Sequence, residues 1–187
     1  MATGFSDPPY TEWLESPVPD RNMSLLREFW FEDRAGRRWV SAAGSVINGA
    51  SIPRALWTLL GSPYTGSYRR ASVVHDVACV QAQGDDERRA ADRMFYEACR
   101  VGGCSIDEAT ILYTGVRIGA GWSRYVGQSA ESRPRIERRA EDRRIEADFQ
   151  IVATKVLQEP SSDDPFEVER RVDQALIDLN RLPPHAD

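Results

Sequence analysis

The amino-acid sequence predicts an α+β fold, namely a mainly α-helical core with a small antiparallel β element and a C-terminal helical hairpin. Aromatic and β-branched runs around a Gly-containing turn, within about residues 25–48, predict short paired strands. Apolar residues then recur at helical spacing, and a capping box over Ser105–Glu108 marks one helix start. We therefore expect helix to exceed strand clearly, with strand confined to about residues 25–48.

The composition is typical of a folded globular protein. Hydrophobic residues make up 41% of the 187 residues, and the 5 Trp, 6 Phe and 6 Tyr can fill a core. The formal net charge of -5 argues against nucleic-acid binding through bulk electrostatics. No run approaches the roughly 18 apolar residues that span a bilayer, and the N-terminus lacks a signal-peptide pattern. Three cysteines do not make a disulfide framework, so we expect a cytoplasmic protein.

The first 22 residues contain four prolines around Trp13 and predict an irregular arm whose Trp13 docks on the body of the protein. The runs Leu25–Glu32 and Arg37–Val40 flank a Gly-containing turn and predict a β-hairpin. A third short strand is expected over residues 45–47, before the Gly49 turn.

Four helices are expected to follow. Pro53 is suited to the first turn of a short helix, with Leu56, Trp57, Leu59 and Leu60 on its buried side. The second helix is predicted over Tyr68–Ala82, with its apolar stripe running from Ala71 to Gln81, and the third over Glu87–Val101. The fourth begins at Ser105, and its glycines at positions 115, 119 and 121 favour close backbone packing.

The composition changes near residue 129, and this change predicts three parts: an irregular N-terminal arm (1–22), a core domain (23–127) and a charged C-terminal helical extension (128–187). Arginines and acids interleave over residues 133–144, a pattern typical of a solvated helix with ion pairs. Two amphipathic stripes joined by a Pro/Ser/Asp turn then predict an antiparallel helical hairpin. The first stripe contains Ile145, Phe149, Val152 and Val156, and the second contains Phe166, Val168, Val172, Ala175, Leu176 and Leu179.

Several motifs follow one another in a specific order: Asn48-Gly49-Ala50-Ser51-Ile52-Pro53-Arg54, a following Trp57, Val73-Val74-His75-Asp76 and Ala91-Asp92-Arg93-Met94-Phe95-Tyr96. From about Phe29 to Trp122 the chain resembles the DUF1353 family, a domain of unknown function common in phages, prophages and bacterial genomes. The resemblance implies a phage or prophage association, and with it a virion as a second possible location. It implies no established activity. The usual turn of the family has Asp where this chain has Asn48, which weakens a metal-ligand role for that position.

The His75-Asp76 pair is the first candidate for chemistry. On a helix, His75 would lie beside the apolar stripe at the boundary of the core. A histidine there can act as a general base or a metal ligand, with Asp92 orienting its other ring nitrogen. The alternative is a buried histidine that hydrogen-bonds Asp92 and ties two helices together.

Ser51 is a second candidate, as the nucleophile of a small hydrolase that uses His75 with Asp76 or Asp92. A serine two residues before a helical proline is also an ordinary N-cap residue, and capping is the stronger interpretation. Zinc is a third possibility, because His75 and Cys79 are spaced i,i+4 and Cys99 and Cys104 follow. No short Cys-x-x-Cys pair supports a metal site, so we expect no cofactor, with zinc or another divalent metal as the open alternative.

Two hypotheses of function therefore remain. The first is a phage- or prophage-associated interaction or assembly protein with a structural His-Asp cluster, which binds a partner protein or a second copy through residues 129–182. The second is a small hydrolase centred on His75.

Overall fold

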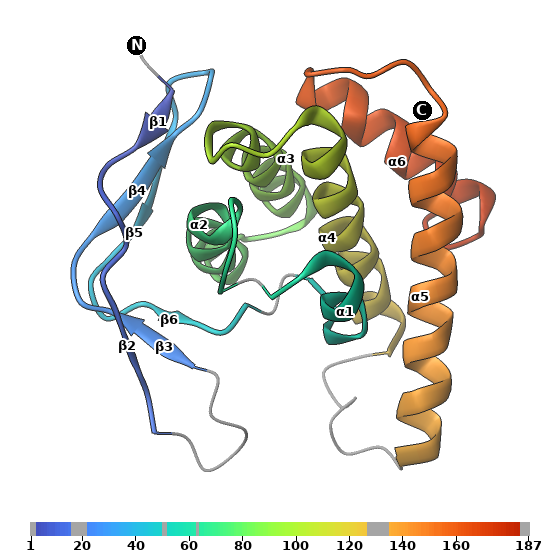
Figure 1. Ribbon diagram of the computed structural model, residues 1–187, viewed down its shortest axis with the longest axis horizontal. Helices are drawn as coiled ribbons and strands as arrows, with labels where there is room; N and C mark the ends of the chain where they lie inside the picture. Colours follow the sequence, from blue (N-terminus) through green and yellow to red (C-terminus); the bar gives the residue numbers. More distant parts are fainter. Residues whose placement is uncertain (1–2, 16–21, 50–51, 63, 127–134, 184–187) are drawn as a thin grey trace. The chain divides into compact units, whose positions relative to one another are not determined.

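The computed structural model describes residues 3–15, 22–49, 52–62, 64–126 and 135–183, without the side chains of residues 122–126 and 135. Small antiparallel sheets and long helices together confirm the predicted α+β class (Figure 1). The chain forms two compact units, each assembled from separate segments. Unit 1 contains Met1–Ser51 and Ser62–Ser105, and unit 2 contains Ile52–Gly61 and Ile106–Asp187. The predicted boundary at residues 127–128 lies outside the described residues, and the three-part division stays a prediction.

Unit 1 carries two three-stranded antiparallel sheets. The predicted hairpin is confirmed as β4 (Phe29–Glu32) and β5 (Arg38–Ser41), in register from Phe29 opposite Ser41 to Glu32 opposite Arg38. The predicted third strand is β6 (Val46–Ile47), which pairs with β3 (Met23–Leu25) instead of extending the hairpin.

The expectation of an irregular N-terminal arm is wrong, because two short strands lie in it. The expectation that strands are confined to about residues 25–48 is wrong for the same reason. β1 (Gly4–Phe5) pairs with β4, and β2 (Thr11–Trp13) pairs with β3. Two- and three-residue strands show no periodicity, and they are held here by non-local partners: the Phe5 ring stacks on Phe29 at a centroid distance of 5.7 Å. Trp13 meets the Tyr64 ring at 5.6 Å but keeps 59% of its surface exposed, so it docks only in part.

The helices of unit 1 are α2 (Arg69–Gln81) and α3 (Asp85–Val101), which pack against each other. In Figure 1 the strands line one side of α2 and α3 lies on the other. Every α2 residue from position 71 to 78 is buried, because the helix contacts β4, β5 and β6 as well as α3. The predicted stripe is therefore too narrow, and it also ends earlier than expected, since Gln81 is exposed.

Unit 2 begins with a short 3-10 turn, η1 (Arg54–Leu56), continued by α1 (Trp57–Leu60). Pro53 precedes the turn as its N-cap, and of the four residues predicted to be buried only Leu56 is. α4 (Ile106–Val126) starts where the capping box predicts. The predicted close packing is present at Gly115, where an added Cβ would lie 3.0 Å from a methyl group of Leu60.

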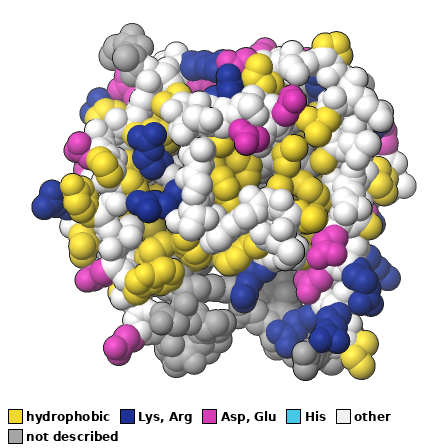
Figure 2. All heavy atoms as spheres, in the orientation of Figure 1, with side chains coloured by type: hydrophobic (Ala, Val, Ile, Leu, Met, Phe, Trp, Pro, Cys, Tyr) yellow, Lys and Arg dark blue, Asp and Glu magenta, His cyan; other side chains and the backbone are white. Residues whose placement is uncertain are grey.

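The C-terminal helices are α5 (Arg135–Leu157) and α6 (Pro165–Asp178), and they contact each other and α4. The turn between them ends at Asp164, whose side chain accepts the Phe166 N–H at 3.0 Å, with Pro165 in the first turn as helix starts favour. Exposed arginines gather at the beginning of α5 (Figure 2), and the residues concerned are Arg138, Arg139, Arg143 and Arg144. Most of both predicted stripes is buried inside unit 2, whereas Phe166 is exposed.

An ion pair also lies in the interior of unit 2. Arg117 of α4 donates from Nε and Nη2 to Oδ1 of Asp173 on α6, at 2.9 and 2.7 Å. The two side chains are 4% and 0% exposed. Among the described residues, no helix combines the length and apolar character that crossing a membrane requires.

Candidate functional site

Helices α2 and α3 bring together three side chains with chemical potential: His75, Cys79 and Asp92. His75 and Cys79 are four positions apart and therefore project from one side of α2. Asp92 projects from α3, whose first turn is strongly acidic and so favours a helix start there. The contact between the two helices buries His75 and Asp92 completely. The expectation of a histidine at the core boundary is wrong, because every α2 residue from position 71 to 78 is buried, and no histidine is visible on the face that Figure 2 shows.

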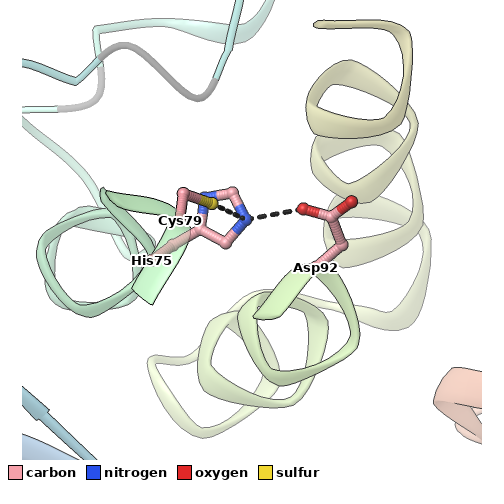
Figure 3. A group of neighbouring side chains, drawn as sticks. All are labelled: His75, Cys79 and Asp92. Carbon is pink, nitrogen blue, oxygen red and sulfur yellow. Dashed lines mark hydrogen bonds and ion pairs between the residues drawn. The ribbon is translucent and has the colours of Figure 1, made fainter. Parts of the chain in front are cut away.

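The three side chains meet at one atom. His75 Nε2 lies 2.8 Å from Asp92 Oδ1 and 3.3 Å from Cys79 Sγ, and both contacts converge on that nitrogen in Figure 3. The Phe95 ring covers the imidazole at a centroid distance of 4.8 Å. His75 Nδ1 is buried and has no hydrogen-bond partner among the described residues.

The charge state of His75 follows from these neighbours. Burial is the largest single influence and lowers the His75 pKa, but the adjacent Cys79 and the hydrogen bond that the imidazole donates to Asp92 outweigh it and raise the pKa from 6.5 to about 10. The direction of this shift favours the protonated imidazole beside the Asp92 carboxylate. Arg88 adds a second cation, with its Nε 3.9 Å from Asp92 Oδ1.

This arrangement differs from a nucleophile–histidine–acid triad. In a triad the nucleophile contacts one ring nitrogen while the acid holds the other, so that the acid fixes the tautomer and leaves the lone pair for the nucleophile. Here the thiol and the carboxylate share Nε2. Asp92 therefore competes with Cys79 for the proton of that nitrogen, and no relay from acid through histidine to nucleophile exists.

Asp76 has a different role from its neighbour. Its Oδ2 accepts the backbone N–H groups of Asn48 and Gly49, at 3.1 and 2.7 Å. Gly49 has φ 63°, a left-handed conformation that glycine adopts readily, so the carboxylate fixes a sharp turn after β6. Asp76 thus joins α2 to the strands, while His75 joins α2 to α3. Ser51, the predicted nucleophile or N-cap, lies outside the described residues.

The other two cysteines do not join the cluster. Cys99 and Cys104 are buried and hydrogen-bonded to each other, and burial together with Cys104 raises the pKa of the Cys99 thiol. Burial and these two thiols also raise the pKa of Tyr68 to about 12. The group of close metal-ligand atoms within the described part of the chain consists of His75, Cys79 and Asp92.

Sequence reasoning missed a hollow of about 190 Å³ on the strand side of unit 1. The register of the second sheet places Trp13, Met23 and Ile47 side by side across β2, β3 and β6, so the pleat turns all three to one face. These residues line the hollow with Tyr64, Arg69 and Asp76. Alternation of Thr11, Glu12 and Trp13 was the available signal, but three residues are too few to predict a strand.

A family model described as "Protein of unknown function (DUF1353)" matches residues 23–116, half of the chain. The chain belongs to the DUF1353 family. The DUF1353 match includes His75, Asp76, Cys79 and Asp92, and it excludes Trp13.

Two curated relatives come from Sinorhizobium fredii (strain NBRC 101917 / NGR234). "Uncharacterized protein y4jT" is 33% identical over 122 residues, which cover 64% of this chain and 35% of the relative. "Uncharacterized protein y4iH" is 32% identical over 101 residues, covering 52% of this chain and 40% of the relative. The chain thus spans well under half the length of these relatives. No solved structure shows significant similarity.

Proposed function

We propose that this DUF1353 protein is an interaction protein whose His75–Asp92 pair is structural and whose hollow in unit 1 binds a segment of a partner polypeptide. The observation that carries the proposal is the meeting of Trp13, Tyr64 and Arg69 at this hollow. Trp, Tyr and Arg are the residue types that dominate binding energy in protein interfaces.

The chemistry of the hollow indicates the kind of segment. Trp13 is more than half exposed and offers an indole surface beside Tyr64. The Arg69 side chain is exposed and lines the hollow, and it makes no ion pair with another described residue. Met23 and Ile47 add apolar surface to the lining of the hollow. A segment with an aromatic or aliphatic side chain next to an acidic residue would complement these groups.

The hydrolase hypothesis has less support, because His75 and Asp92 are wholly buried and Cys79 and Asp92 share one ring nitrogen. Association through residues 129–182 is also less well supported than the hollow. The stripes that suggested it are largely buried inside unit 2, which leaves separate exposed residues such as Ile151 and Phe166 for a partner. The phage or prophage association is proposed from the family resemblance alone.

A peptide library displayed on a surface and selected against the full chain tests the proposal. We expect enrichment of peptides that pair an aromatic or aliphatic residue with an acid, and we expect Trp13→Ala and Arg69→Ala each to weaken their binding about tenfold or more. Tyr10→Ala is the matched control, since Tyr10 is 49% exposed and belongs to the same sheet region but does not line the hollow.

Two results would count against the proposal. Selected peptides that bind the Trp13 and Arg69 variants as tightly as the unaltered chain would place the binding surface elsewhere. Hydrolysis of an ester or phosphate substrate that is lost in His75→Gln but kept in Trp13→Ala would instead favour the hydrolase.

A further inference from the structure

The His75 cluster places three ligand atoms of different types around one point. Two of these ligand atoms meet the third at the ring nitrogen of His75. Here Nε2 has two partners, Cys79 and Asp92, while Nδ1 has none among the described residues. A nitrogen, a sulfur and a carboxylate oxygen that lie within 4.8 Å of one another form a set of ligand atoms that one metal ion can engage.

The spacing of these atoms is compatible with zinc. The usual zinc–nitrogen, zinc–sulfur and zinc–oxygen bonds, set at tetrahedral angles, separate neighbouring ligand atoms by about 3.3–3.6 Å. The imidazole-to-thiol distance is 3.3 Å and the imidazole-to-carboxylate distance is 2.8 Å, and all ligand atoms lie within 4.8 Å of one another. The Asp92 carboxylate would move away from the imidazole nitrogen and the most widely separated ligand atoms would close toward each other, by up to about one ångström, to reach this spacing.

The ligand types select the metal. A thiolate and an imidazole prefer Zn²⁺ to Mg²⁺ or Ca²⁺, which take oxygen ligands. A thiolate and a carboxylate together balance the two charges of the ion, so the filled site is neutral apart from Arg88. Cys79 is only half-buried, and it gives solvent and metal access to the cluster.

We infer that His75, Cys79 and Asp92 bind one Zn²⁺ ion, which ties α2 to α3 within unit 1. Three protein ligands leave one tetrahedral position for a solvent molecule. Within the described part of the chain Nδ1 has no acceptor of the kind that usually orients a zinc-bound histidine, so the affinity is expected to be lower than that of a four-ligand structural site. The inference does not depend on the partner proposed above, and either can fail alone.

Titration of the metal-free full chain with Co²⁺, followed by displacement with Zn²⁺, tests the inference. We expect one equivalent of Co²⁺ to give a thiolate-to-cobalt charge-transfer band that Zn²⁺ abolishes, and we expect Zn²⁺ to raise the Tm in proportion to the logarithm of its concentration. Cys79→Ala should weaken metal binding about 100-fold or more and remove the band. Cys104→Ser should keep both, because Cys104 is outside the cluster.

A variant that is expected to bind Zn²⁺ more tightly tests whether weaker binding in Cys79→Ala results only from loss of folding. Arg88 lies 3.9 Å from the Asp92 carboxylate and opposes a cation there, so Arg88→Gln should tighten Zn²⁺ binding several-fold. Absence of a one-equivalent Co²⁺ complex in the folded protein would overturn the inference. So would a complex that persists unchanged in Cys79→Ala or disappears in Cys104→Ser.

Discussion

The two units each bury an ionisable pair between helices, and the pairs differ in whether the cation can lose its charge. In unit 2, Arg117 faces Asp173, and a guanidinium stays protonated at any accessible pH. In unit 1, His75 faces Asp92 with the same near-complete burial, but imidazole releases its proton when the carboxylate is lost. We therefore expect the arginine pair to act as a fixed structural link and the histidine pair as a link that depends on pH and on ligands.

The largest expected effect comes from leaving the arginine without its carboxylate. Asp173→Ala should lower the free energy of unfolding by about 3–5 kcal/mol, because a charged Arg117 then remains in the interior. Urea unfolding at neutral pH measures the change. Asp178→Ala is the control, since both side chains of its ion pair with Lys155 are exposed to solvent, which screens the pair, so the free energy of unfolding should change little.

The corresponding change in unit 1 should cost less. Asp92→Ala is expected to lower the free energy of unfolding by about 1–3 kcal/mol, because His75 can become neutral and then leaves only an unsatisfied polar group. The same urea measurement in metal-free buffer gives the value. A cost equal to that of Asp173→Ala would mean that His75 keeps its charge without a partner, and the contrast between the pairs would fail.

The pH dependence of stability separates the pairs further. The His75 pKa is raised from 6.5 to about 10 in the folded protein, so the unfolded chain loses this proton first as the pH rises. The stabilisation from His75 is complete below about pH 6.5 and is lost as the pH rises toward 10. We expect this decline in metal-free full chain and a flatter profile in Asp92→Asn. Asp173→Asn should keep the decline, and a decline of the same size in Asp92→Asn would assign it to other groups.

The smallest expected effect is that of the thiol. Without metal, Cys79→Ser should change the free energy of unfolding by less than about 1 kcal/mol, because Cys79 is half-buried and a serine hydroxyl can keep a hydrogen bond to His75. Thermal unfolding with and without Zn²⁺ measures this change and its metal dependence. A large loss of stability in metal-free buffer would show that the thiol belongs to the structural link itself.

Local signals in the sequence were enough to predict the helices and the hairpin. The capping box before α4 and the Pro/Ser/Asp turn before α6 involve neighbouring residues only, so no knowledge of the fold is needed. The strands in the N-terminal arm could not be predicted, because Phe5 and Trp13 are held by partners far along the chain. Their sequence contains too few residues to show alternation.

The His75 cluster and the Arg117–Asp173 pair likewise combine features that neighbouring residues predict with features that depend on distant partners. The i,i+4 spacing predicted that His75 and Cys79 lie on one side of a helix, and Asp92 was predicted as a partner of His75. That Cys79 and Asp92 contact the same ring nitrogen depends on how α3 packs against α2, which the sequence pattern does not give. The Arg117–Asp173 pair was missed although a signal existed. Asp173 stands three positions before Leu176 on an apolar stripe, and a charged residue in such a place commonly has a buried partner.

The alternation of segments between the two units has a consequence for synthesis on the ribosome. Residues 52–61 belong to unit 2, yet their partners begin only at Ile106 and include α5. The side chains of Ile52 and Leu56 pack beside Gly115 of α4. Both residues therefore leave the ribosome long before the helices that bury them. At about 5–20 residues per second this interval is on the order of ten seconds. Unit 1 can complete its own contacts during that time, so we expect the nascent chain to acquire the His75–Asp92 link first and to bind chaperones through residues 52–61.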